Sequence, residues 1–139
     1  MNAYLPGLEG VPATQSNISE LDGVNGLLTY RGYRIADLAV NSTFEETSLL
    51  LLDGRLPSAD ELAQFDHELR ANRVVKYNVR EIMKYLPATG HPMEMLQTAV
   101  ASLGMFYQGD ECLTGGDMCE DLNYVHNMSV KIIARMATI

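Results

Sequence analysis

The stretch that decides the class of fold is TFEETSLLLLDG, residues 43–54. Thr43 and Glu46 have the spacing of a capping box, in which a hydroxyl and a carboxylate satisfy the first backbone amides of a helix. The leucines that follow are apolar on nearly every side, which predicts a helix that is buried all round. Gly54 is the residue type that closes a helix at its C-terminus.

The same signals recur downstream, so the chain from Thr43 onward is predicted to be a succession of helices. A second capping box, SADE, stands at 58–61, and a short third helix begins at Asn78 and stops at Pro87. Pro92 occupies the first position of a fourth helix, and a fifth starts near Glu120. The apolar spacing predicts these inner positions in the last two helices: Met93, Leu96, Val100 and Leu103, then Leu122, Val125, Ser129, Ile132, Ile133 and Met136.

Upstream of these helices the chain has turn signals instead. Asp22-Gly23 and Asn25-Gly26 supply the positive φ angles that tight turns need, so segments 11–21 and 27–35 are expected to double back as a hairpin. A lone hairpin is marginal in water and must lie on the helices or on another chain. We therefore predict a mainly α fold, with an N-terminal hairpin arm over residues 1–40 and a helical part over 41–139.

Composition excludes several classes of protein. The 139 residues include 10 Lys and Arg against 18 Asp and Glu, a net charge of −8, which argues against a nucleic-acid binder. No apolar run approaches the roughly 20 residues that span a bilayer. Residues 1–7 lack the basic start and apolar core of a secretory signal, so we expect a cytoplasmic protein. The last apolar pattern continues to Ile139 without a cap, which we interpret as a truncated chain.

The three histidines carry no motif of nucleophilic catalysis. His67 is expected on the polar face of its helix, His91 at a helix start, where it caps or packs, and His126 in a core or interface. Because no flanking motif accompanies them, we assign none of the three a catalytic role.

Metal and anion sites are equally unsupported. Cys112 and Cys119 are separated by six residues and lack the paired spacing of a zinc site. The acidic loop Gly109–Asp121 does not follow the calcium-loop pattern, so a solvated loop is favoured. The cluster YRGYR at 30–34 could bind an anion, although it more often would lock the hairpin to the helical body.

Several segments, in order along the chain, resemble the citrate synthase family. They are GLEGVPATQSNIS at 7–19, LLTYRGYRIADLA at 27–39, FEE leading into LLLDGRLP within 44–57, HPM at 91–93 and IARMATI at 133–139. The resemblance therefore extends from about Gly7 to the end of the chain. We identify the chain as the N-terminal portion of such a protein.

The resemblance implies a large, almost wholly helical homodimeric enzyme that condenses acetyl-CoA with oxaloacetate to citrate and free CoA. The family's catalytic Asp, its two catalytic His and its substrate-binding Arg residues occupy motifs that this chain does not contain. We accordingly assign no catalytic, cofactor-binding or metal-binding residue and no cofactor, and we expect this fragment to be inactive.

The resemblance also indicates what this chain contributes. The His91 helix and the Leu122 helix resemble those that pack across the family's dimer interface, and segment 30–35 resembles an arm anchored on the large domain. Two alternatives stay open. One is a fragment of 2-methylcitrate synthase, which uses propionyl-CoA. The other is a non-catalytic helical interaction module.

Overall fold

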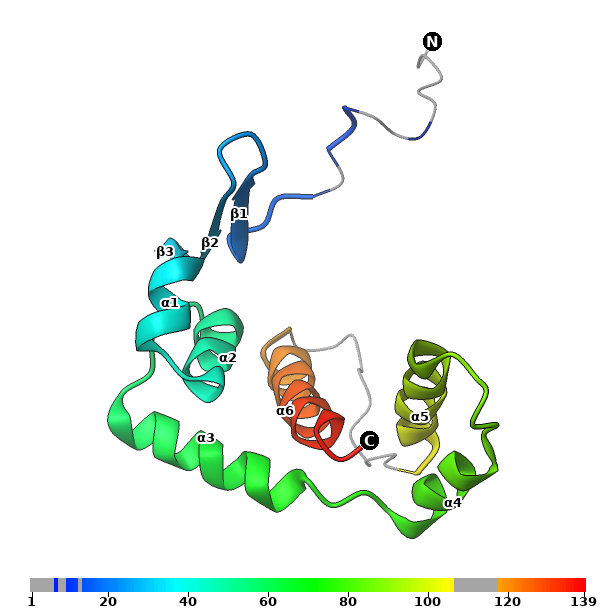
Figure 1. The fold of residues 1–139 in the computed structure, drawn as a ribbon. Helices are drawn as coiled ribbons and strands as arrows, with labels where there is room; N and C mark the ends of the chain where they lie inside the picture. Colours follow the sequence, from blue (N-terminus) through cyan, green and yellow to red (C-terminus); the bar gives the residue numbers. More distant parts are fainter. Residues whose placement is uncertain (1–6, 8–9, 13, 107–117) are drawn as a thin grey trace. The chain divides into compact units, whose positions relative to one another are not determined.

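The computed structural model describes residues 7, 10–12, 14–106 and 118–139, with backbone only for 118–120. It divides the chain into two compact units, residues 1–58 and residues 59–139. Within the described ranges, six helices follow three short strands (Figure 1). None of these helices is long and apolar enough to cross a membrane.

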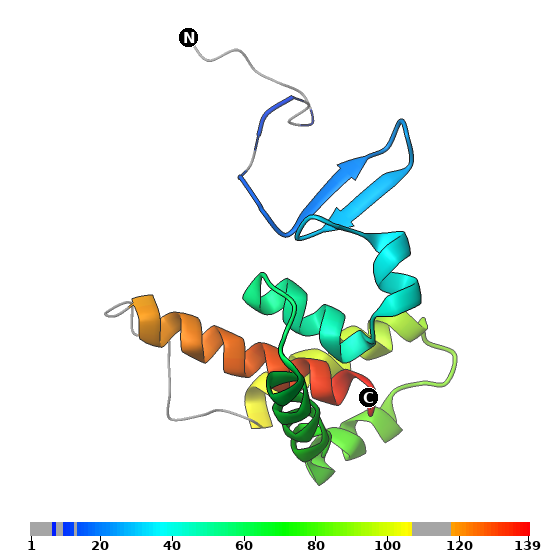
Figure 2. The ribbon, with the colours of Figure 1, turned by 90° about the vertical axis from the view of Figure 1, so that its left-hand side faces the viewer.

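The first unit contains an antiparallel sheet in the order β1 (Ser19–Asp22), β2 (Leu27–Tyr30) and β3 (Tyr33–Arg34). The predicted hairpin is confirmed, since Asp22 pairs with Leu27. Gly26 has the predicted positive φ angle, 63°, whereas Gly23 does not, so the prediction for Asp22-Gly23 is wrong. Figure 2 shows the long β1–β2 connection at the tip of the hairpin.

A second turn, which we did not predict, joins β2 to β3. Tyr30 pairs with Tyr33, and the two residues between them have positive φ angles, 49° at Arg31 and 88° at Gly32. Positive φ at both central positions defines the type I′ turn, which matches the right-handed twist of antiparallel strands. An arginine is unusual there because its Cβ is crowded in the left-handed region, and this is why the sequence did not reveal the turn.

The arm is also shorter than expected. Strand structure ends at Arg34, and helix α1 occupies Ile35–Asn41, which we had placed within the extended arm of residues 1–40. The compact unit itself runs on to Ser58. The assignment of 1–40 and 41–139 as separate parts of a larger protein stays a prediction.

Helix α2, Phe44–Asp53, forms as the capping box predicts, with one difference. The Thr43 hydroxyl accepts a hydrogen bond from the Glu46 amide at 3.1 Å. The Glu46 carboxylate, however, accepts from the Ser42 hydroxyl at 2.8 Å. Gly54 ends the helix with a φ of 82°, and its amide donates to the Leu50 carbonyl at 2.9 Å, so the predicted C-terminal cap is confirmed.

The second unit is built from four helices, in which α3 packs on α6 and α4 packs on α5. Pro92 is the first residue of α5, as predicted. Lys76, just before α4, donates from its Nζ to the Phe106 carbonyl at the end of α5. The helices are α3 (Ala59–Asn72), α4 (Tyr77–Tyr85), α5 (Pro92–Phe106) and α6 (Met118–Met136).

Buried apolar side chains hold this unit together. Phe65 and Leu69 are buried on α3, and Val130 and Ala134 are buried on α6. A separate cluster joins α4 to α5. It comprises Val75, Val79 and Leu103, with Met83, Phe106 and Ile139 packed against it.

The predicted inner faces of α5 and α6 are partly wrong. On α5, Leu103 is buried, whereas Met93 is exposed. On α6, the exposed side chains include four of the six predicted inner ones: Leu122, Val125, Ile132 and Met136. The helix carries apolar residues on two faces, and α3 covers the face of Val130 and Ala134. Helix α6 also ends at Met136, so it does not run through Ile139 as predicted.

Candidate functional site

The three histidines lie on different elements. His67 is exposed on α3, and His126 is half-buried on α6. The Nδ1 of His91 accepts a hydrogen bond from the Met93 amide at 3.2 Å, so the predicted cap of α5 is confirmed. Each is therefore accounted for by its place on a helix surface or at a helix end.

The sequence assigns no metal site to Cys112, Cys119 or the acidic loop Gly109–Asp121. Across the described ranges, no group of three or more His, Cys, Asp or Glu residues could hold a metal ion. Cys112 and most of the acidic loop Gly109–Asp121 lie outside the described residues, as does the side chain of Cys119.

The 30–34 cluster is expected from the sequence either to bind an anion or to attach the hairpin to the helices, and the contacts of Arg31 favour attachment. Its Nη2 donates to the Leu51 carbonyl at 2.9 Å. A Cβ added at Gly54 would lie 3.6 Å from the Arg31 Cζ, so the guanidinium packs against the C-terminal end of α2. A cation is favourable there because the helix dipole places negative charge at that end. Arg31 thus fastens the β2–β3 turn to α2 within the first unit.

Two carboxyl groups have shifted pKa values, one in each unit. The Asn25 side chain, by hydrogen bonding, is the main cause that lowers the pKa of Asp22 below its ordinary 3.8. The Lys84 ammonium, hydrogen-bonded to the carboxylate at 2.6 Å, is the main cause that lowers the pKa of Glu81. Both groups are held ionised at neutral pH, which suits a structural role and not proton transfer.

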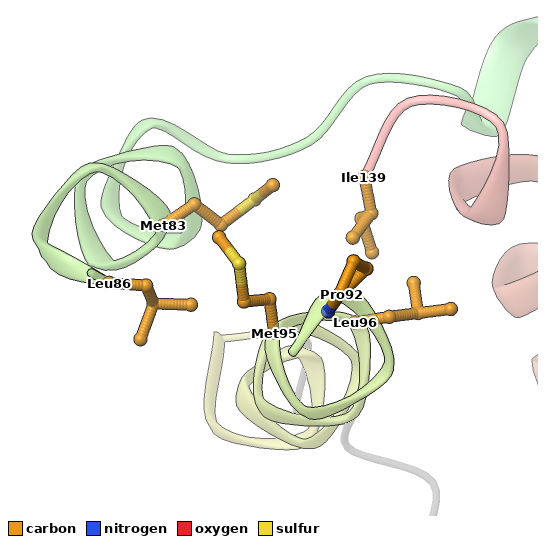
Figure 3. Close-up of a pocket in the computed structure, with 6 residues that line it drawn as sticks. All are labelled: Met83, Leu86, Pro92, Met95, Leu96 and Ile139. Carbon is orange, nitrogen blue, oxygen red and sulfur yellow. The ribbon is translucent and has the colours of Figure 1, made fainter. Parts of the chain in front are cut away.

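An apolar pocket of about 240 Å³ lies between α4, α5 and the last residue. Figure 3 shows the Met83 and Met95 side chains lying toward one another, with Ile139 approaching over Pro92. The remaining lining residues are Leu86 and Leu96. The six side chains are apolar and offer no acid or base group, so the pocket suits an apolar group.

Helix α6 carries an exposed apolar stripe, which we call the Leu122 face. It consists of Leu122, Val125, Ile132 and Met136, between 41% and 62% exposed. Their spacing follows the helical repeat, so they form one stripe. Helix α5 adds exposed Met93 and Met105. Large apolar stripes of this kind mark interaction surfaces. The sequence identified the residues and the expected role in a dimer, although it placed them inside the fold.

Comparison with known proteins gives a consistent result. The family profile described as "Citrate synthase, C-terminal domain" matches residues 7–139. A citrate synthase from Acidithiobacillus ferridurans is 62% identical over 98% of this chain. A 2-methylcitrate synthase from Shewanella oneidensis is 40% identical over 70% of it.

The fold is similar to that of a solved protein. The crystal structure of citrate synthase from Pyrobaculum aerophilum superposes with a TM-score of 0.84 at 38% identity and covers 95% of this chain. The chain spans only 35% of the length of the Acidithiobacillus protein and 33% of the Pyrobaculum chain. It is therefore similar to about a third of each relative.

Proposed function

The chain belongs to the citrate synthase family, and on that premise we propose that it forms the N-terminal portion of an enzyme condensing acetyl-CoA with oxaloacetate to citrate and free CoA. The observation that carries this proposal is the 62% identity to a protein named citrate synthase over nearly the whole chain. Two chains with an identity of that size share the same backbone fold.

Within such an enzyme, this portion supplies the framework and not the chemistry. The family's catalytic residues have no counterpart among His67, His91 and His126, and the contacts of these residues support that assignment. His67 is exposed and His91 is used as a helix cap. The reacting groups would then come from the other two thirds of a protein of the relatives' length. We assign this portion no cofactor or metal, and we propose the cytoplasm as its location.

The second part of the proposal concerns the partner. The Leu122 face would pack against a second copy of the chain, together with α5. Dimer interfaces are most apolar at their centre, and a stripe of Leu, Val, Ile and Met side chains has the required composition. Covering it also removes the cost of leaving these side chains in water, about 25 cal/mol for each Å² buried.

A 2-methylcitrate synthase is the alternative that a specific observation favours, because the Shewanella relative of that name is 40% identical over 70% of the chain. The two enzymes differ in the acyl group, acetyl or propionyl.

The experiment is an assay of CoA release with a thiol reagent, using acetyl-CoA or propionyl-CoA together with oxaloacetate. We expect no release from the 139-residue chain. We expect release, faster with acetyl-CoA, from the protein that the reading frame encodes once it is read past codon 139. Turnover by the short chain would contradict the framework role. Faster release with propionyl-CoA would favour the alternative, and a stop directly after codon 139 would favour the interaction module.

A further inference from the structure

The connection between β1 and β2 contains a reactive dipeptide, Asn25-Gly26. The chain has eight asparagines, and Asn25 alone is followed by glycine. An asparagine side chain is attacked by the backbone nitrogen of the next residue, and a side chain on that residue hinders the attack. Glycine has none, so Asn25 is the asparagine most open to this reaction.

Within the described ranges, no neighbouring group hinders this reaction sterically. Asn25 and Gly26 are both exposed, and a Cβ placed on Gly26 would have no atom within 4 Å. In the part of the chain that the structure describes, the Gly26 amide donates no hydrogen bond. In a second pair, Asp53-Gly54, the Gly54 amide donates a hydrogen bond to the Leu50 carbonyl at 2.9 Å. The attacking nitrogen is therefore accessible in the first pair and engaged in the second.

One contact opposes the reaction. The Asn25 Nδ2 donates to Asp22 Oδ2 at 2.6 Å, while Asp22 Oδ1 accepts from the Asn25 and Val24 amides at 3.0 Å. The side-chain amide of Asn25 must turn toward the Gly26 nitrogen before it can react. The carboxylate of Asp22 holds it in another orientation, so this contact acts as a latch.

We propose that Asn25 is the deamidation site of this chain and that the Asp22 carboxylate slows its conversion. The Gly26 nitrogen forms a bond to the Asn25 Cγ and loses its proton to solvent. The Cγ–Nδ2 bond then breaks and ammonia leaves, which closes a succinimide ring. Water opens the ring at either carbonyl and yields aspartate or isoaspartate, with no change in oxidation state.

Conversion changes the turn that sets the register of β1 and β2. The product has lost the Nδ2 donor and places a second carboxylate beside that of Asp22. Isoaspartate also lengthens the backbone by one carbon, and register is sensitive to the length of a hairpin connection. The modification would therefore loosen the hairpin in the first unit and leave the second unit unchanged.

The test is to age the folded chain at mildly alkaline pH and to follow each asparagine by peptide mass spectrometry, with enzymatic labelling of isoaspartate. We expect the Asn25 peptide to convert to both acids while the Asn41 and Asn127 peptides stay intact. Gly26→Ala should slow the conversion severalfold. If Asn25 converts no faster than Asn41 and Asn127, the site is wrong.

The latch is tested by Asp22→Ala, with Glu20→Ala as the matched control on the same strand. We expect the first to accelerate Asn25 conversion severalfold in the folded chain and the second to leave it unchanged. In urea-unfolded chains, wild type and Asp22→Ala should convert at similar rates, because the latch exists only in the fold. Equal folded rates for the two variants, or the same acceleration in urea, would overturn the role of Asp22.

Discussion

Among the described residues, the first unit buries three apolar side chains, Leu38, Leu49 and Leu50. The second unit buries eight, from Phe65 to Ala134. The first unit adds to its few buried side chains a series of directed polar contacts at its turns and helix ends. They include Asp22 on two amides, Arg31 on the Leu51 carbonyl and Thr43 on the Glu46 amide.

This difference indicates that the units are stable for different reasons. Burying apolar area is the larger source of free energy, whereas a single hydrogen bond contributes only about 0.5–1.5 kcal/mol. The second unit should therefore depend on packing and the first on local contacts that fix its turns. Both units still expose large apolar side chains, for example Phe44 in the first and Leu122 in the second.

The largest effect should come from the interior of the second unit. Phe65 is 3% exposed, and Phe65→Ala should lower the free energy of unfolding by about 3–5 kcal/mol because it leaves a cavity. Phe44, 67% exposed in the first unit, is the matched control, and Phe44→Ala should change stability by less than about 0.5 kcal/mol. Urea unfolding followed by circular dichroism measures both. Equal losses would show that the two units do not differ in this way.

The next largest effect is expected at the contact between Arg31 and α2 in the first unit. Arg31→Met keeps the aliphatic stem and removes the guanidinium that binds the Leu51 carbonyl. We expect a loss of about 1.5–3 kcal/mol, the range for a hydrogen bond to a charged group. The loss should appear as faster hydrogen exchange of α2 amides. Arg34→Met, at an exposed position on β3, should leave that exchange unchanged.

A smaller effect is expected at the start of α2. Thr43→Ala removes the hydroxyl that accepts from the Glu46 amide and should cost about 1 kcal/mol. Thr14→Ala is the control, since among the described residues the Thr14 hydroxyl donates to the Gln15 carbonyl alone, at 3.4 Å. A cost at Thr43 no greater than at Thr14 would mean that the cap does not stabilise this unit.

The smallest expected effect is a different response to salt of the two carboxyl groups whose pKa values are lowered. Asp22 is held by neutral amides and Glu81 by the Lys84 ammonium. Salt screens charge pairs, so added NaCl should move the pKa of Glu81 back toward its ordinary value and leave that of Asp22 lowered. Carboxyl titrations by NMR at low and high salt measure both. An equal response of the two groups would contradict these assigned causes.

The direction of the pH effect follows from the sign of the shifts. Each folded pKa lies below its unfolded value, so each carboxylate stabilises the fold above the unfolded pKa. That stabilisation is lost as the pH falls through the folded pKa. Acid should therefore loosen the β1–β2 turn, and Asp22→Ala should remove this part of the acid dependence.

The features of the fold that the sequence predicted correctly are mostly local ones, namely helix ends and turns. The Thr43 cap, the Gly54 cap, Pro92 at the start of α5 and the Asn25-Gly26 turn all depend on residues close together in the chain, and the structure confirms them. The type I′ turn escaped prediction because an arginine at positive φ is uncommon, and the contact of Arg31 with α2 is made by residues 20 positions apart in the chain.

Nonlocal choices could not be predicted from spacing. Helix α6 has two apolar faces, and periodicity cannot tell which of them α3 will cover. The predicted face, with Leu122 and Val125, is the exposed one, while Val130 and Ala134 are buried. The exposed face is the one on which the proposed dimer contact rests.

The central claim is that the Leu122 face pairs with a second copy of the chain, and sedimentation velocity tests it most directly. Val125, 48% exposed on that face, and Val24, 95% exposed at the hairpin turn, allow the same substitution to be compared at two places. We predict a dimer for wild type and for Val24→Glu, and a shift to monomer for Val125→Glu with unchanged helix content. A monomeric wild type, or a Val125→Glu variant that sediments like the dimer, would contradict the claim.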